Sequence, residues 1–278
     1  MNILSPLKNA IQGKSRSSNR ESLSACFNQS AMQSFETSAF TERQPFPWYN
    51  FQSLLTDDTF AQLYDEFPSL DFFETHEGLP RKHGQRSHDR YYLAYEETVY
   101  QKIERADKGI IGHEQLSPTW QAFMTGLQTD PGYREFICRL LGVDEFVARY
   151  AWHVATAGRS VSPHMDSVRK IGTHIFYFNT SQDWQAEWGG ATLVLSGKRY
   201  DGLNPEISDF DKVEAVQVMD NRSFLFKNQP EAWHAVDTIN CPPETYRRIF
   251  NVIFELPESA QPRSKKPTST PKKRRLFG

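Results

Sequence analysis

The hydrophobic pattern of the chain changes near Phe146, and this change constrains the fold more than any other feature. From that point onward, short apolar or alternating runs are separated by turn residues, a pattern typical of β-strands. The predicted strand regions are 146–156, 171–179, 191–195, 213–219, 223–227 and 247–256. Because no long helical segment lies between them to connect parallel strands, we expect an antiparallel sandwich or barrel.

The region before it, residues 46–145, spaces its apolar residues as helices do. One helix is predicted over 56–67. A second is predicted to begin at Pro118 after an N-cap at Ser117, and a third to run from Pro131 to a stop at Gly142. The sequence therefore predicts one α+β domain over 46–258, with helical support at 46–145 and a β core at 146–258.

The two ends of the chain differ from this domain in composition. Residues 1–45 are rich in Ser, Asn, Gln and Thr, so we expect a disordered or loosely attached segment. Residues 259–278 form a basic tail, also expected to be disordered, with seven Lys or Arg and no acid; the net charge of -2 therefore leaves -9 for residues 1–258. We expect no nucleic-acid partner for this acidic core, whereas the tail could contact anions or act as a nuclear address in a eukaryote.

Cysteine usage and hydropathy bear on where in the cell the protein is located. The three cysteines, Cys26, Cys138 and Cys241, are far apart and form no CxxC pair, so a reducing, cytoplasmic location is predicted. No apolar run reaches the roughly 18 residues needed to span a bilayer, so no membrane partner is expected. The oligomeric state is left open by the sequence.

Three residues form a candidate metal site. His164 and Asp166 are two positions apart, so in an extended segment their side chains point the same way and could bind one ion. Such a pair occurs by chance too often to assign a site alone. A facial triad of two histidines and one carboxylate needs a further imidazole, which His234 could supply from a neighbouring strand; an ordinary buried or surface histidine is the alternative. His153 and His174 also lie on predicted strands, where roles without metal are favoured.

Residues 150–255 resemble the double-stranded β-helix, or jelly-roll, core of iron(II)- and 2-oxoglutarate-dependent oxygenases, and are most similar to the prolyl-hydroxylase-like branch. The resemblance rests on motifs in the expected order: His164-x-Asp166, Ile175-Phe176-Tyr177-Phe178-Asn179, Asp183-Trp184, Trp188-Gly189-Gly190-Ala191-Thr192-Leu193, Trp233-His234 and Arg247-Arg248-Ile249-Phe250-Asn251. The Gly189-Gly190 pair alone is also consistent with an ordinary turn.

The resemblance implies which groups the site binds. It implies Fe(II) on His164, Asp166 and His234, with 2-oxoglutarate and O2 as cosubstrates, and it further allows ascorbate as a reductant. Tyr177 matches a tyrosine that reaches the 2-oxoglutarate carboxylate in such relatives, although a core tyrosine bonded to backbone is equally consistent with the pattern. A basic residue on the last strand is expected to pair with that carboxylate.

Arg247 is predicted to be this anchor, with Arg248 as the alternative. Strand side chains alternate, so only one of the two arginines faces the barrel interior. Arg247 shares its face with the polar Asn251, which is also a candidate cosubstrate contact, whereas Arg248 shares its face with phenylalanines that suit helix packing. The chain lacks the arginine-x-serine pattern that is commonest in the family, having Ile249 two residues after Arg247.

The function implied is hydroxylation of an unactivated C–H bond on a protein or peptide side chain, with proline as the first guess. Hydroxylation of a small metabolite or free amino acid is an alternative, because a fold does not determine a substrate. A catalytically silent jelly-roll binding module is the alternative from another class. The basic segment 81–92 is interpreted either as a lid over the site or as a solvated loop.

Overall fold

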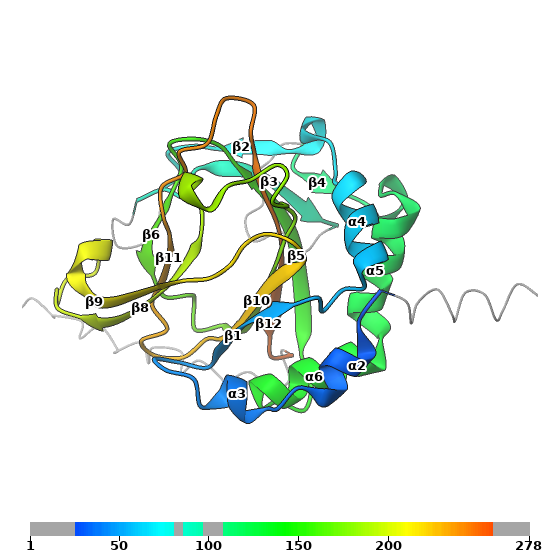
Figure 1. The fold of residues 1–278 in the computed structure, drawn as a ribbon, viewed down its shortest axis with the longest axis horizontal. Coiled ribbons are helices and arrows are strands. Elements are labelled where there is room, and N and C mark those ends of the chain that lie inside the picture. The colour runs from blue at the N-terminus through cyan, green and yellow to red at the C-terminus, as the bar shows by residue number, and fades with distance from the viewer. Residues whose placement is uncertain (1–25, 81–85, 97–107, 258–278) are drawn as a thin grey trace, which may run out of the picture.

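The structure, a computed structural model, describes residues 26–80, 86–96 and 108–257. Two β-sheets face each other across a central space, and most of the helices lie against the outer side of the larger sheet (Figure 1). The larger sheet has the strand order β1-β10-β7-β12-β5-β3-β2, with β4 beside β3. Its strands are β1 (Trp48–Gln52), β2 (Glu74–His76), β3 (Arg90–Tyr95), β4 (Ile110–Ile111), β5 (Val147–Ala155), β7 (Lys170–Tyr177), β10 (Arg222–Lys227) and β12 (Arg247–Glu255).

The smaller sheet has four strands in the order β6-β11-β8-β9. These are β6 (Val161–His164), β8 (Thr192–Lys198), β9 (Phe210–Ala215) and β11 (His234–Val236). All strand pairs in both sheets are antiparallel except that of β3 with β4. The expectation of an antiparallel, jelly-roll core in an α+β fold is therefore confirmed.

Capping residues set the ends of the helices. Ser117 and Asp130 accept hydrogen bonds from the backbone N–H groups of Trp120 and Tyr133, and Gly142 ends the second of these helices in the left-handed conformation at φ 67°. The α-helices are α2 (Gln29–Ser34), α3 (Ser38–Thr41), α4 (Asp57–Asp65), α5 (Pro118–Thr129) and α6 (Pro131–Leu141); short 3-10 helices are η1 (Leu70–Phe72), η3 (His113–Gln115), η4 (Ala186–Trp188) and η5 (Ile207–Asp209). The three predicted helices correspond to α4, α5 and α6.

The alternation of β12 separates the core from the interior of the barrel. Phe250, Val252 and Phe254 belong to the hydrophobic cluster that joins the larger sheet to the helices. The ring of Phe250, for example, lies 5.3 Å from that of Trp120 on α5. The intervening residues of β12 point to the opposite side, into the space between the two sheets. One face of the strand thus stabilises the fold, and the other is available for a site.

Two expectations about the N-terminal half need correction. Residues 26–45 are packed rather than loose, because the few apolar side chains there are well placed: Phe27 stacks on Tyr133 at 4.7 Å, and Met32 and Phe40 are buried. Residues 46–145 are not only helical, since β1 to β4 belong to this region and extend the larger sheet. Residues 1–25 and 258–278, including the basic tail, lie outside the described residues.

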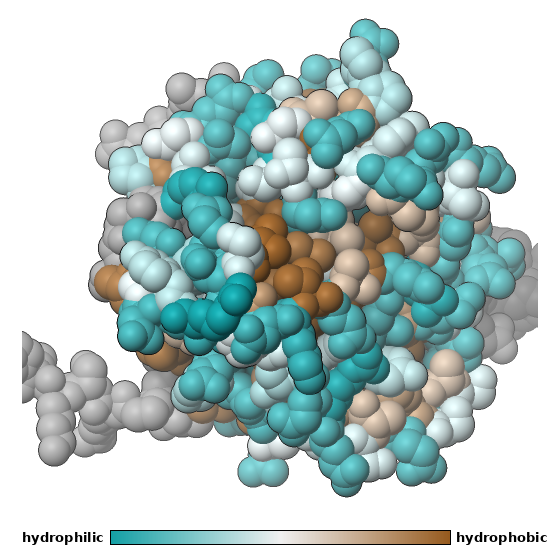
Figure 2. All heavy atoms as spheres, turned by 60° about the vertical axis from the view of Figure 1, so that its left-hand side comes forward, coloured by the Kyte–Doolittle hydropathy of each residue, from teal (hydrophilic) through white to brown (hydrophobic). Residues whose placement is uncertain are grey.

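Among the helices that the structure describes, none is both long and apolar enough to cross a membrane. Figure 2 shows the side of the molecule on which β8 and β9 lie. Hydrophobic residues gather near the centre of this face, and hydrophilic residues surround them.

Candidate metal centre and cavity

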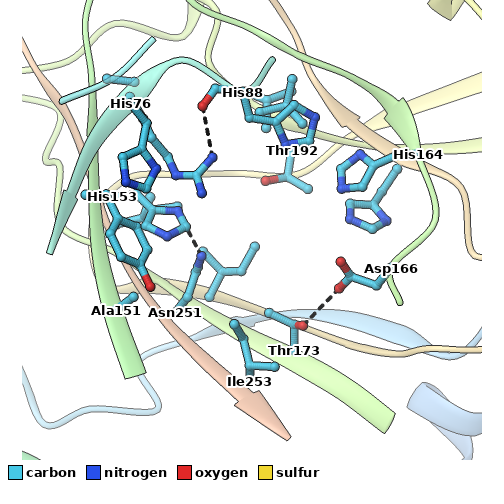
Figure 3. Close-up of a pocket in the computed structure, with 18 of the residues that line it drawn as sticks. His76, His88, Ala151, His153, His164, Asp166, Thr173, Thr192, Asn251 and Ile253 are labelled. Atoms are coloured by element: carbon cyan, nitrogen blue, oxygen red, sulfur yellow. Dashed lines mark hydrogen bonds between the residues drawn. The ribbon is translucent and has the colours of Figure 1, made fainter. Parts of the chain in front are cut away.

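His164, Asp166 and His234 come together in the smaller sheet. His164 ends β6 and His234 begins β11, and the two residues are direct partners in the strand pairing. Asp166 follows β6 after one residue. One potential ligand atom from each side chain lies within 4.8 Å of those of the other two, and all three residues line one cavity. Figure 3 shows His164 and Asp166 on one side of this cavity. Strand pairing therefore brings His164 and His234 together although they are 70 positions apart in the sequence.

Both imidazoles are oriented by backbone carbonyls. Nδ1 of His164 lies 2.9 Å from the carbonyl oxygen of Ser162, and Nδ1 of His234 lies 3.1 Å from that of Ala232. A carbonyl oxygen can only accept a hydrogen bond, so each Nδ1 carries the proton and each Nε2 carries the lone pair. A metal ligand needs that lone pair, and the second hydrogen bond fixes the ring, so both histidines fit metal binding.

Asp166 is held as a carboxylate by its neighbours. Lys170 donates to one carboxylate oxygen at 2.7 Å, and the hydroxyl of Thr173 donates to the other at 3.3 Å. Burial alone would raise the pKa of Asp166, but the positive charge and hydrogen bond of Lys170, with the electrostatic effect of the adjacent His234 and His164 rings, hold this pKa below its ordinary value. Two neutral imidazoles and one carboxylate are the donor set of a facial iron(II) site. These residues therefore fit an iron ion.

The triad borders a cavity of about 780 Å³ between the two sheets. Alternate residues of β12 line it, beginning with Arg247 and continuing to Glu255, together with alternate residues of β5. Part of the lining is apolar, with Ile175, Phe226 and Ile249 among its members. The ring of Phe226 also lies 4.7 Å from that of His234. The candidate metal centre is thus located in the wall of a partly apolar cavity.

Arg247 projects into this cavity and is 6% exposed. Its guanidinium lies 3.5 Å from the hydroxyl of Thr192, which in turn accepts a hydrogen bond from Tyr177 at 2.8 Å. Burial lowers the pKa of Arg247, although Tyr177 and Asp237 act in the opposite direction. Within the part of the chain that the structure describes, no salt bridge reaches Arg247, and its Nε has no hydrogen-bond partner. A buried guanidinium without a carboxylate partner among the described residues is suited to binding an anionic ligand.

Gly190 makes room for Arg247. A Cβ atom at this position would lie 2.9 Å from Cδ of Arg247, and the backbone has φ +77°, a value that L side chains rarely adopt. At Gly189, where φ is also positive, a Cβ atom would collide with the carbonyl oxygen of Thr238. The Gly-Gly pair therefore permits close packing beside the cavity and is more than an ordinary turn.

The other candidate cosubstrate contacts, Arg248, Asn251 and Tyr177, differ in their positions relative to the cavity. Arg248 pairs with Asp183 at 2.6 Å and lies over the ring of Tyr64 at 4.3 Å, on the helical side of β12. Asn251 lines the cavity, whereas Tyr177 lies behind Thr192 and is 1% exposed. The role of each of these residues toward a cosubstrate stays a prediction.

The two other strand histidines do not belong to the metal-binding group that the described residues form. His174 is buried on the helical side, where it meets the hydroxyl of Tyr133 at 3.0 Å. His153 lines the cavity and lies 3.1 Å from the amide nitrogen of Asn251. Burial holds the pKa of His153 well below its ordinary value, and nearby Arg90 lowers it further, so this histidine is neutral.

Sequence reasoning missed several residues of the site. Lys170 and Thr173, which hold Asp166, and Thr192, which contacts Arg247, were not predicted. Lys170 follows Asp166 by four residues, but this spacing predicts a contact only if the turn between them is already known. Of the basic segment 81–92, residues 81–85 lie outside the described residues, and Arg90 begins β3 and lines the cavity.

Comparison with known proteins gives two kinds of likeness. Residues 146–255 match the family model described as the 2OG-Fe(II) oxygenase superfamily, and this segment contains the whole triad and Arg247. No curated protein matches the sequence. A crystal structure of a Pseudomonas putida prolyl-4-hydroxylase is similar, with 14% identity, a TM-score of 0.50 and coverage of 80% of this chain and 100% of that chain.

A second similar structure is that of the non-heme alpha-ketoglutarate-dependent carbocyclase SnoK from nogalamycin biosynthesis. It has 12% identity and a TM-score of 0.51, and the match covers 81% of this chain and 85% of that chain. At these identities the structural likenesses show the fold, while the family match covers the residues of the site.

Proposed function

We propose that this chain, a member of the 2-oxoglutarate- and iron(II)-dependent oxygenase superfamily with a prolyl-hydroxylase-like core, hydroxylates an unactivated C–H bond on a protein or peptide side chain, with proline as the first candidate. The enzyme class implies Fe(II), 2-oxoglutarate and O2 as the groups that the site uses. One observation carries the proposal. The triad of His164, Asp166 and His234 borders the same cavity as the buried guanidinium of Arg247.

The residues at the candidate metal site have two roles, binding the iron and holding its ligands in position. His164, Asp166 and His234 would hold the iron, which when bound supplies the oxidising chemistry that no side chain can perform. Lys170 and Thr173 keep Asp166 ionised and in place, and the two backbone carbonyls keep the imidazoles oriented. The three candidate ligand side chains are therefore oriented for metal binding by hydrogen bonds within the protein.

Arg247 would bind the far carboxylate of 2-oxoglutarate. Its charge is buried, and the Thr192 hydroxyl beside it could contribute a second hydrogen bond to that carboxylate. Ile175, Ile249 and Phe226 give part of the cavity an apolar lining. These apolar side chains would contact the hydrocarbon part of a substrate and help to position its C–H bond beside the metal.

A second candidate substrate is a small metabolite or a free amino acid, and the size of the cavity favours it. A volume of about 780 Å³ lies within the range of roughly 300 to 1,000 Å³ that is typical of small-molecule pockets. A single amino-acid side chain of a peptide would also fit this volume. Cytoplasmic location belongs to the proposal as well and is supported by the free thiols of Cys26, Cys138 and Cys241.

The test is succinate release from 2-oxoglutarate with added iron(II), with and without candidate substrates. Proline-containing peptides and free amino acids form two panels, and mass spectrometry identifies any molecule that gains one oxygen atom. A hydroxylated peptide would support the first candidate, and a hydroxylated free amino acid the second. Absence of succinate under every condition, with iron bound, would refute the proposed activity. Stimulation by ascorbate in the same assay would test its use as a reductant.

A further inference from the structure

A row of aromatic side chains follows the cavity wall formed by β2, β3 and β5. His76, Tyr92 and His153 all line the cavity, and Tyr92 is the register partner of His153. The rings of His76 and His153 lie 4.7 and 5.3 Å from the ring of Tyr92. Nε2 of His76 lies 2.6 Å from the carboxylate of Glu74, which fixes the end of the row. The ring of Tyr92 is therefore held between two neighbours.

One hydrogen bond decides which nitrogen of His153 carries a proton. Nδ2 of Asn251 lies 3.1 Å from Nδ1 of His153, and an amide nitrogen can only donate, so Nδ1 accepts. Burial, and after it the charge of Arg90, holds the pKa of His153 well below its ordinary value, so the ring stays neutral. Its single proton is then on Nε2. His153 can offer a ligand in the cavity an uncharged N–H donor.

Tyr92 adds a second uncharged donor to the same wall. Burial raises the pKa of its hydroxyl, which therefore keeps its proton at neutral pH. Among the residues that the structure describes, neither this hydroxyl nor Nε2 of His153 has a hydrogen-bond partner. Polar groups that lose water without gaining a partner cost free energy, so a ligand that accepts from both donors is favoured.

Small side chains leave room beside these donors. Two residues along the strands from Tyr92 and His153, Ala94 is paired with Ala151, and Ala151 is also the partner of Asn251 on β12. Methyl groups are thus the side chains of β3 and β5 at this level, and Ala151 lines the cavity. We call the space bounded by Tyr92, Ala151, His153 and Asn251 the His153 subsite.

A diagonal of polar side chains connects the His153 subsite with the candidate metal centre. Asn251 contacts His153 on one side, and on the other side it is paired with Ile175 of β7, two residues from Thr173. Thr173 donates to Asp166 at 3.3 Å. Diagonal neighbours in an antiparallel pair are about 7 to 8 Å apart, so a group held in the subsite is within reach of the metal for a small molecule or a short peptide.

Figure 3 shows the same arrangement in space. His153 and Asn251 lie on one side of the cavity and Asp166 on the other, with Thr173 near Asp166. A molecule that spans the cavity from the His153 subsite would therefore bring its other end to the metal ligands.

We infer that the substrate presents a carbonyl oxygen, of an amide or of a carboxylate, to the His153 subsite, where the ring N–H of His153 and the hydroxyl of Tyr92 donate to it. This inference rests on the proposed hydroxylase function. A carbonyl oxygen has two lone pairs and can accept from both donors at once, whereas an ammonium group cannot accept from His153. Asn251 is a positioning residue, because it fixes the tautomer of His153. His153 and Tyr92 are then the residues that select the substrate and place its C–H bond beside the metal.

The experiment measures binding by NMR, without turnover. Protein loaded with Zn(II) in place of iron, saturated with 2-oxoglutarate and labelled with ¹⁵N in its histidine rings is titrated with N,N-dimethylacetamide, which has a carbonyl oxygen and no N–H, and with acetate. The variants are Tyr92→Phe, His153→Phe, His153→Gln and Tyr91→Phe, and His153→Phe also identifies the ring signals of His153. Tyr91 is a matched control, since it is adjacent on β3 but packs against the hydrophobic cluster on the other face of the sheet and does not line the cavity.

In the unmodified chain, at least one probe should bind and shift the Nε2 signal of His153. Tyr92→Phe and His153→Phe should each weaken this binding about three- to tenfold, the scale of one buried hydrogen bond. His153→Gln, which keeps an N–H donor, should retain part of the affinity, and Tyr91→Phe should retain all of it. The probe that binds more tightly tells an amide from a carboxylate.

The tautomer is read from the same spectra. His153 should carry its proton on Nε2 in the unmodified chain, and Asn251→Leu, which cannot donate to Nδ1, should give a mixture of the two tautomers. A proton on Nδ1 in the unmodified chain, the same single tautomer in Asn251→Leu, no binding of either probe, or unchanged affinity in Tyr92→Phe or His153→Phe would overturn the inference. Failure of succinate release would instead refute the hydroxylase proposal, because the binding experiment requires no turnover.

Discussion

Removal of the Arg247 guanidinium is expected to weaken the binding of 2-oxoglutarate by about a hundredfold. The side chain is 6% exposed, and its Nε has no hydrogen-bond partner among the described residues, so its charge is available to a ligand and poorly screened by water. A charge-assisted pair in such a setting contributes roughly 3 kcal/mol, which corresponds to about two orders of magnitude in affinity. Arg247→Ala should therefore raise the KM for 2-oxoglutarate by this factor.

The assay separates cosubstrate binding from catalysis. The KM is obtained from succinate release at saturating iron(II), and the dissociation constant of 2-oxoglutarate is measured independently on Mn(II)-loaded protein. Both constants should rise together in Arg247→Ala, and Arg247→Lys should recover part of the affinity because it keeps the charge but loses the planar pair of donors. The affinity for Mn(II) alone should not change, since Arg247 is not a metal ligand.

Arg248→Ala is the matched control because it removes the same group from the adjacent position of β12. Arg248 faces the helices, where it pairs with Asp183 and covers the ring of Tyr64. Its loss should leave the KM for 2-oxoglutarate nearly unchanged and lower the free energy of unfolding by at most about 1 kcal/mol, as for a partly exposed ion pair. A large rise in KM for Arg248→Ala together with a normal KM for Arg247→Ala would refute the assignment.

Three further predictions concern the metal site and its surroundings. His164→Ala, Asp166→Ala and His234→Ala should each lose measurable turnover at limiting iron while keeping a cooperative thermal unfolding transition; full activity in any of them would show that it is not a ligand. Gly190→Ala should raise the KM for 2-oxoglutarate and leave Mn(II) affinity intact, because the added Cβ would displace the Arg247 side chain; an unchanged KM would argue against this contact. Products formed in chloride-rich buffer should gain oxygen only, since Asp166 would provide the ligand whose absence a chloride ion would need, and a chlorinated product detected by mass spectrometry would contradict this.

The common direction of His164 and Asp166 and the facing of the last strand could be predicted from the sequence because they depend on short-range rules. His164 and Asp166 are two residues apart on extended backbone, and the alternation along β12 separates Arg247 from Phe250. The triad required one further step, the placing of His234, which the ordered motifs supplied and which strand pairing with His164 explains.

The place of His76 and Tyr92 in the lining of the cavity could not be predicted in this way. It depends on β2 and β3 joining the edge of the larger sheet, so His76 meets Tyr92 and Tyr92 meets His153 only after long-range pairing. The order of residues 26–45 was missed for a related reason. Helices of six and four residues are too short to show a periodicity, and Phe27 gains its burial from α5 and α6, about a hundred residues away.

The central claim is that His164, Asp166 and His234 hold an iron ion that oxidises 2-oxoglutarate with molecular oxygen. The most direct test is the mass of the succinate formed under ¹⁸O2, with iron(II), 2-oxoglutarate and a cell extract that supplies substrates. The enzyme should produce succinate that carries one ¹⁸O atom, at a rate that depends on added iron and is lost in Asp166→Ala. Unlabelled succinate, or labelled succinate formed equally fast by Asp166→Ala, would contradict the account.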